Sequence, residues 1–233
     1  MSRSLPTYLL CTGLALGGAA HAGERGPVML ELYTSQGCSS CPPADALISE
    51  LALRDDVLPL ALHVDYWDYI GWVDQFASPA YTERQKSYAE SVGSRAIFTP
   101  QIIVGGTDHV VGSKPDQVDR LIEKHAADPS PVTLSLERGD DMVTIDASLD
   151  EDTWEGNMMV QLVRFDPHER VVIEGGENAG QTIDYVNIVT EWRVLGQWAG
   201  EVPFRAELEV EGPLAVVVQK AGPGEVLAVA QID

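Results

Sequence analysis

The 233-residue sequence has little cysteine and little positive charge. Its 15 lysine and arginine residues stand against 36 acidic residues, which gives a formal net charge of −21 at pH 7. A surface this acidic is a poor match for the phosphates of a nucleic acid or for an anionic membrane, so neither is expected as a partner. We interpret the negative charge as a solubilising surface.

The N-terminal apolar stretch is too short to cross a membrane. It covers residues 9–20, follows the positively charged Arg3, and precedes the small-residue sequence Ala20-His21-Ala22. This order is typical of a secretory signal peptide rather than of a transmembrane helix. We therefore expect cleavage near Ala22, no membrane span in the mature chain, and a periplasmic or secreted location.

Cysteine is scarce, and the three residues are unevenly placed. Cleavage would remove Cys11 and leave only Cys38 and Cys41. Two cysteines so close together form a ring too small to stabilise a fold as much as a longer disulfide loop would. In an oxidising compartment, the pair therefore favours redox chemistry or metal binding over a purely structural role.

The Cys pair lies at a predicted junction between a strand and a helix. The apolar run 28–33 predicts the strand, and the spacing of apolar residues over 44–51 predicts the helix. Pro42 and Pro43 suit the first helical turn, where a missing N–H group costs nothing. The partial positive charge of a helix N-terminus favours the thiolate form of Cys38.

The chain changes character after a Pro-rich segment at 126–131, which we take as a domain boundary. Before it, strands are predicted at 57–64, 97–104 and 108–111, with helices at 79–91 and from 113 to about 125. After it, short runs with a period of two predict seven or eight strands and an antiparallel sandwich. The predicted division is a signal peptide at 1–22 and domains at 23–128 and 129–233.

Four segments carry a resemblance to a known family; they are Glu31–Asp45, His63–Asp68, Thr99–Gln101 and Glu177–Thr182. The element order and the Cys-x-x-Cys position resemble the thioredoxin fold, and the chain is similar to a bacterial family of secreted thioredoxin-like proteins of unassigned function. The resemblance implies an α/β thioredoxin-like N-terminal domain followed by an all-β, sandwich-like C-terminal domain.

The resemblance also implies roles for residues outside the Cys pair. Thr99-Pro100 should be a cis peptide bond opposite the cysteines, where the Thr99 backbone would meet an extended substrate chain. Thioredoxins carry a buried Asp near the end of the first active-site strand. Here the strand has Glu31 instead, one residue further from the cysteines, and it is either a proton acceptor for Cys41 or a hydrogen-bonded strand carboxylate.

An aromatic loop follows the second strand and contains Tyr66, Trp67, Tyr69 and Trp72. We expect these side chains to pack over the Cys pair or to form an interaction surface, with Tyr66 and Trp67 as candidate substrate-binding residues. The turn at 177–182 is expected to dock structurally against the first domain.

Three functions fit this pattern. The first is a thiol–disulfide oxidoreductase acting on protein thiols, in which Cys38 attacks and Cys41 resolves the mixed disulfide. The second is Cu(I) or Zn binding by Cys38 and Cys41 with His63 as a further ligand. The third is a non-catalytic binding protein with a permanently closed disulfide. The redox function needs no cofactor, and Gly175-Gly176 lacks the lysine and helix of a phosphate-binding loop.

Overall fold

The computed structural model describes residues 26–139, 142–149 and 156–233, so the predicted signal peptide lies outside the described residues. The described first half alternates strands and helices: β1 Val28–Thr34, α1 Pro42–Leu51, β2 Val57–His63, the 3-10 helix η1 Asp68–Ile70, α2 Pro79–Ser91, β3 Gln101–Val104, β4 Asp108–Val111 and α3 Pro115–Ala127. The second half contains only strands among its described elements: β5 Val132–Arg138, β6 Val143–Leu149, β7 Met158–Val172, β8 Thr182–Trp198, β9 Phe204–Leu208, β10 Leu214–Lys220 and β11 Val226–Ile232.

One eight-stranded mixed sheet runs through both halves, in the order β11-β10-β7-β8-β2-β1-β3-β4. β1 and β2 are parallel neighbours, β3 and β4 pair antiparallel beside β1, and β8 joins β2 in parallel through Ala61 and Ile188. A second sheet of three strands, β5-β6-β9, packs against β7, β10 and β11 across a shared apolar core. The described chain is therefore mostly β, with helices only in its first half.

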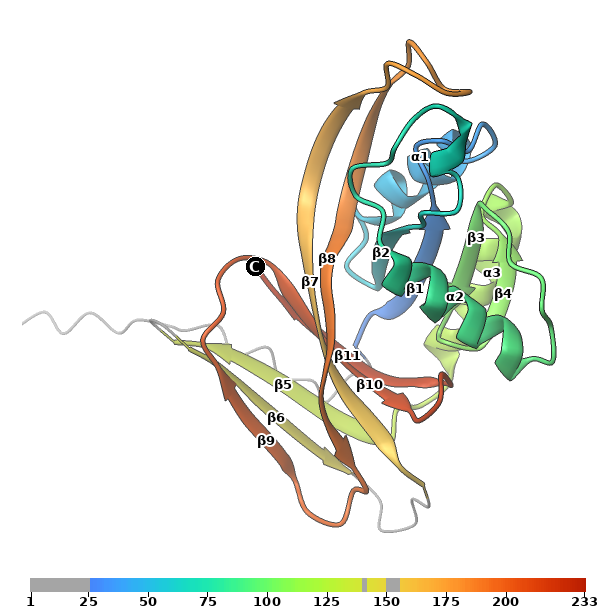
Figure 1. Ribbon diagram of the computed structural model, residues 1–233. Helices are drawn as coiled ribbons and strands as arrows, with labels where there is room; N and C mark the ends of the chain where they lie inside the picture. Colours follow the sequence, from blue (N-terminus) through green and yellow to red (C-terminus); the bar gives the residue numbers. More distant parts are fainter. Residues whose placement is uncertain (1–25, 140–141, 150–155) are drawn as a thin grey trace, which may run out of the picture.

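The prediction of a separate α/β thioredoxin-like domain followed by an independent sandwich is wrong. The long β7–β8 hairpin leaves the second half of the chain and extends along the first half beside β2 (Figure 1). The hairpin was not predicted because residues 166–170 are exposed and consist of polar side chains and Pro167, which interrupts the apolar alternation in the middle of β7. The apolar runs predict two shorter strands at 158–165 and 171–174, whereas β7 runs without a break from Met158 to Val172.

The two faces of β1 point into different cores. Every residue of β1 is buried, and successive side chains of a strand alternate between the faces of a sheet. Leu30 and Leu32 pack with apolar residues of α1 and α3 on one face. Met29 and Tyr33 pack with Tyr88 of α2 on the other face. The Cys pair lies at the N-terminal end of α1. The alternation of β1 therefore determines which polar side chains share the α1 face of the sheet with the pair.

Candidate functional site around the Cys pair

The two cysteines form a disulfide at the start of α1, with S–S 2.17 Å and Cα–Cα 5.4 Å. Cys41 is the N-cap of the helix, and its carbonyl accepts the N–H groups of Ala44 at 2.8 Å and Asp45 at 3.1 Å. Both cysteines are fully buried, whereas Ser39 and Ser40 between them are exposed. The strand-to-helix junction predicted for the pair is confirmed.

The Thr99–Pro100 peptide bond is cis, as the resemblance implied. Ser40 connects this bond to the disulfide: its Oγ lies 3.4 Å from Cys38 Sγ and donates to the Thr99 carbonyl at 3.4 Å. The predicted placement of the cis bond opposite the Cys pair is therefore confirmed. The Thr99 carbonyl is a backbone acceptor directly beside the Cys38–Cys41 ring.

The aromatic loop contributes Trp67 to this arrangement. Its indole Nε1 donates to Thr99 Oγ1 at 2.7 Å, and its Cβ packs so closely on Gly37 that a side chain there would meet it at 3.2 Å. Tyr66 turns toward α2 instead, donating to Gln85 Oε1 at 3.2 Å, and burial raises its pKa to about 12. The structure thus brings Trp67, Thr99 and the Cys loop together, while the substrate-binding roles of Tyr66 and Trp67 stay predictions.

The tip of the β7–β8 hairpin holds the Cys loop in place. Asn178 Nδ2 donates to the carbonyls of Gln36 and Cys38, both at 2.9 Å, and its own Oδ1 accepts from Gln181 at 3.0 Å. Trp72 Nε1 donates to Gln36 Oε1 at 2.7 Å from the aromatic loop. The expected docking of the 177–182 turn is confirmed, and its target is the backbone around Cys38.

A cluster of buried ionisable side chains lies behind the cysteines, on the α1 face of the sheet. Thr34 and His63 are paired neighbours at the ends of β1 and β2, and Thr34 Oγ1 donates to Asp45 Oδ1 at 2.8 Å. His63 Nδ1 lies 2.7 Å from Asp74 Oδ2, and this oxygen also accepts the Gln36 N–H at 2.8 Å. We call Asp45, His63 and Asp74, with Tyr185 beside them, the α1-face cluster.

This cluster has unused hydrogen-bonding capacity. Asp45 Oδ2, His63 Nε2 and Tyr185 Oη are buried and have no hydrogen-bond partner among the described residues. The rings of His63 and Tyr185 meet edge to face with centroids 4.9 Å apart. Burial raises the pKa of Asp45 to about 7, against the lowering influence of His63 and of the Thr34 hydrogen bond, and Asp74 raises it further.

Glu31 lies on the other face of β1, away from α1. Its two carboxylate oxygens accept from Arg84 at 2.6 and 2.9 Å, and they also accept from Tyr33 at 2.8 Å and Tyr88 at 2.6 Å. The Arg84 guanidinium stacks 3.7 Å from the Trp192 ring centroid. The structure therefore does not bring Glu31 together with Cys41, because alternating strand residues point to opposite faces.

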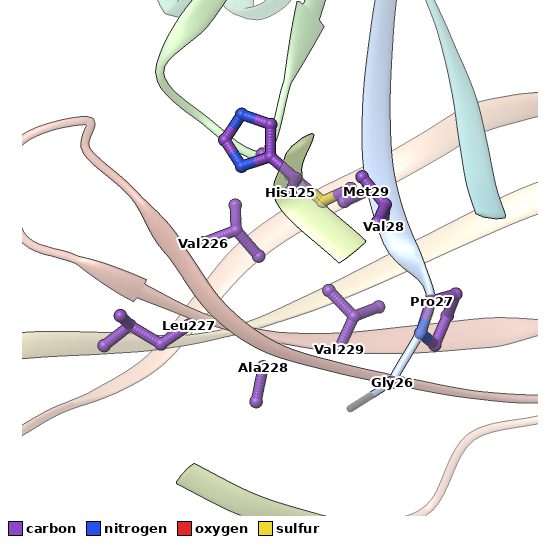
Figure 2. Close-up of a pocket in the computed structure, with 10 residues that line it drawn as sticks. Gly26, Pro27, Val28, Met29, His125, Val226, Leu227, Ala228 and Val229 are labelled. Atoms are coloured by element: carbon purple, nitrogen blue, oxygen red, sulfur yellow. The ribbon is translucent and has the colours of Figure 1, made fainter. Parts of the chain in front are cut away.

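A small cavity lies at the far end of β1, about 20 Å along the strand from Thr34. Figure 2 shows it between the start of β1 and β11, with the His125 ring at one side. Its volume is about 20 Å³, close to what one water molecule needs. His125 is held there by Asp108, whose Oδ2 lies 2.8 Å from Nε2. A cavity of this size fits no protein or organic substrate.

Metal binding by the Cys pair with His63, and the absence of a membrane span, were the remaining expectations. Among the described residues, no group of three or more His, Cys, Asp and Glu side chains is arranged to hold a metal ion. The Cys38 and Cys41 sulfurs are bonded to each other, and His63 Nδ1 is engaged by Asp74. In the part of the chain that the structure covers, the helices are too short or too polar to span a bilayer.

The sequence assigns no role to Asp45 or Asp74, and it includes Asn178 only as part of the docking turn at 177–182. Asp45 follows Cys41 by four residues, which puts both side chains on the same side of a helix, so this spacing could have drawn attention to it. Asp74 sits in an irregular loop, and Asn178 is 140 residues from Cys38 in the sequence. Neither contact has a local sequence signal.

These features define a mostly β protein with a mixed central sheet and a buried Cys-x-x-Cys disulfide where a strand meets a helix. The chain belongs to the family described as "Protein of unknown function (DUF1223)", whose profile matches residues 29–229. No curated protein matches the sequence.

Two solved structures are similar to this chain. One is a protein from Agrobacterium tumefaciens with 32% sequence identity and a TM-score of 0.78; the match covers 91% of this chain and 96% of that chain. The other is HBP35 of Porphyromonas gingivalis, with 15% identity and a TM-score of 0.63 over 90% of this chain and 75% of that chain. At 15% identity the second likeness concerns the fold alone.

Proposed function

We propose that this protein is an exported thiol–disulfide oxidoreductase that exchanges its Cys38–Cys41 disulfide with protein thiols in the periplasm. One observation carries the proposal: the disulfide at the N-terminus of α1 lies beside the cis Thr99–Pro100 bond, with Ser40 contacting both. The same combination supports relationship to the thioredoxin-like superfamily at the level of the site. The sequence of residues 1–22 supports export.

The exchange follows ordinary thiol chemistry. A substrate thiolate attacks Cys38 Sγ, a mixed disulfide forms, and the electron pair of the broken S–S bond leaves on Cys41 Sγ. A second substrate thiolate then attacks the substrate sulfur, so the substrate leaves as a disulfide and Cys38 departs as a thiolate. The helix N-terminus stabilises negative charge on sulfur in both steps, because its unpaired N–H groups carry partial positive charge.

Access is the main requirement of this chemistry. Both cysteines have no exposed surface, and Asn178 ties the Cys38 carbonyl to the hairpin tip. A substrate must therefore displace Ser40 from the Thr99 carbonyl and loosen the loop before it reaches Cys38. Opening of a single surface loop is a low-energy local event compared with global unfolding.

The burial of the disulfide also supports a second candidate function. A cystine sealed from solvent suits a protein in which the bond is permanently closed and another surface binds a partner. In that case the Cys-x-x-Cys ring only fixes the loop between β1 and α1. The metal-binding alternative receives no comparable support from the contacts of His63.

Trapping with a Cys41→Ser variant separates the two candidates. If exchange occurs, the variant retains mixed disulfides on Cys38 after expression in the periplasm, and these adducts disappear on reduction. The matched Cys38→Ser variant should trap few or none, since Cys41 begins the helix beneath the loop. An absence of adducts in Cys41→Ser, from a folded protein, would contradict the exchange function and favour the closed disulfide.

A further inference from the structure

The α1-face cluster contains a buried carboxyl group, Asp45, that is incompletely hydrogen-bonded among the described residues. Asp45, His63 and Asp74 are each less than 5% exposed, at 4%, 0% and 3%. Burying charged groups is expensive unless they are paired and fully hydrogen-bonded. Asp74 meets this condition, because it accepts from Gln36, from Phe76 and from the His63 ring. Asp45 does not, since in the part of the chain that the structure describes its Oδ1 has a hydrogen-bond partner and its Oδ2 has none.

Asp45 is the acidic side chain that follows Cys41, whose sulfur leaves during exchange, by one helical turn. Its N–H donates to the Cys41 carbonyl at 3.1 Å. Side chains four residues apart on a helix are neighbours, with Cβ atoms about 5–6 Å apart. Both side chains are buried, so few water molecules are available to take up or supply the proton in place of Asp45.

We infer that Asp45 is the proton donor and acceptor for Cys41, and that His63 and Asp74 position and tune it. The inference rests on the proposed exchange at Cys38 and assigns the proton that this exchange must move. When the Cys41 thiolate leaves, the protonated Asp45 delivers its proton to sulfur and becomes a carboxylate. In the reverse direction, the carboxylate removes the proton from the Cys41 thiol, and the thiolate attacks the mixed disulfide and releases the substrate thiolate.

The surrounding groups suit this role. Asp74 lies close enough to disfavour a second negative charge on Asp45, whereas His63 favours that charge. Tyr185 approaches from β8, where burial raises its pKa and the charges of Asp45 and Asp74 raise it further, so it stays a neutral donor. Its hydroxyl and His63 Nε2 both lack a hydrogen-bond partner within residues 26–139, 142–149 and 156–233, which leaves them available to stabilise the carboxylate. Glu31 faces the other core and is saturated by its own partners.

The test is a titration of the single Cys41 thiol in a Cys38→Ala background, followed by the ultraviolet absorbance of the thiolate. Asp45→Asn keeps the size of the side chain and removes its charge. If Asp45 exchanges a proton with Cys41, the midpoint of Cys41 ionisation should fall by about one to two pH units, because a like charge one helical turn away is lost. Glu31→Gln is the matched control, with an expected change of less than about 0.3 pH unit.

An unchanged Cys41 midpoint in Asp45→Asn, or an equal shift in Glu31→Gln, would overturn the assignment. Should a variant not fold, the carboxyl ¹³C shift of Asp45 in the unsubstituted protein serves instead. Its titration should move between the oxidised and reduced forms, and an identical curve in both would also overturn it. Both titrations use the isolated protein, whereas trapping by Cys41→Ser depends on a partner protein. The proposed exchange and the Asp45 assignment can therefore fail independently of each other.

Discussion

Two buried carboxyl groups, Glu31 and Asp45, lie on opposite faces of the sheet around β1, and they differ in how completely they are hydrogen-bonded. Glu31, on the α2 face, accepts four hydrogen bonds from Arg84, Tyr33 and Tyr88. Asp45, on the α1 face, has a single side-chain donor, Thr34, and one oxygen without a partner among the described residues. Glu31 is paired with the partly buried Arg84 guanidinium, whereas the groups near Asp45 include His63 and a second carboxylate, Asp74.

The difference indicates that the two carboxylates serve different purposes. A saturated ion pair holds its charge and its geometry, so the Glu31–Arg84 pair joins β1 to α2 as a structural element. An incompletely paired carboxylate changes its protonation easily. Asp45 is also the carboxylate that lies beside the Cys pair, which is where a movable proton has a chemical use.

The largest expected effect comes from breaking the Glu31–Arg84 pair. Arg84→Met leaves the Glu31 charge buried without its cation, and we expect a loss of about 3–5 kcal/mol in the free energy of unfolding. Urea unfolding of the oxidised protein measures it. The double variant Glu31→Gln/Arg84→Met should recover a large part of the loss. A loss below about 1 kcal/mol in Arg84→Met would show that the pair is not structural.

Replacing Asp45 should change how stability depends on pH. The carboxyl has its pKa raised from 3.8 to about 7 by burial, so between these values the folded state binds more protons than the unfolded chain. Stability contributed by the neutral form is therefore present at low pH and lost as pH rises toward 7, by at most about 4 kcal/mol. Asp45→Asn should remove this decline.

Thermal or urea unfolding at several pH values between about 4 and 8 measures the Asp45 effect. Asp45→Asn should gain on the unsubstituted protein as pH rises through this window. A constant difference in stability between the two proteins across this window would contradict the raised pKa of Asp45.

A smaller effect is expected at the hairpin tip. Asn178→Ala leaves the carbonyls of Gln36 and Cys38 without their donor, which costs about 1–3 kcal/mol. Because the loop opens more readily, dithiothreitol should reduce the disulfide roughly tenfold faster for each 1.4 kcal/mol lost locally. Gln181→Ala is the control, since Gln181 only supports Asn178. Equal reduction rates in all three proteins would show that the hairpin does not restrict access.

The smallest predicted effect concerns the hydrogen bond between Trp67 and Thr99. Trp67→Phe and Thr99→Val should each cost about 1 kcal/mol of unfolding free energy. The double variant should lose clearly less than the sum, because both changes remove the same bond. Strict additivity would indicate that the two side chains are not coupled.

The parts of the site that sequence could predict are those fixed by local chemistry. Pro42 and Pro43 begin α1 as their missing N–H groups require, so the position of Cys41 at the helix start follows from a few residues. The cis bond at Thr99–Pro100 followed from the resemblance. Both features, the start of α1 and the cis bond, were predicted from residues that are adjacent in the sequence.

The remaining features depend on contacts between distant segments. Residues 166–170 are exposed and consist of polar side chains and Pro167, so nothing in their pattern indicated that β7 continues past β2. Asn178 reaches Gln36 across 142 positions of sequence. The resemblance pointed to Glu31 on the strand before the cysteines, but strand alternation turns Glu31 to the other face, while helical spacing puts Asp45 on the same side of α1 as Cys41.

The reduction potential of the Cys38–Cys41 pair tests the central claim most directly. Equilibration with glutathione buffers, followed by alkylation and mass spectrometry, gives the value at pH 7. Exchange with periplasmic thiols predicts a potential above about −230 mV, in the range of exchange catalysts. A value below about −300 mV would contradict the account, because a disulfide that stable is a structural bond in its compartment.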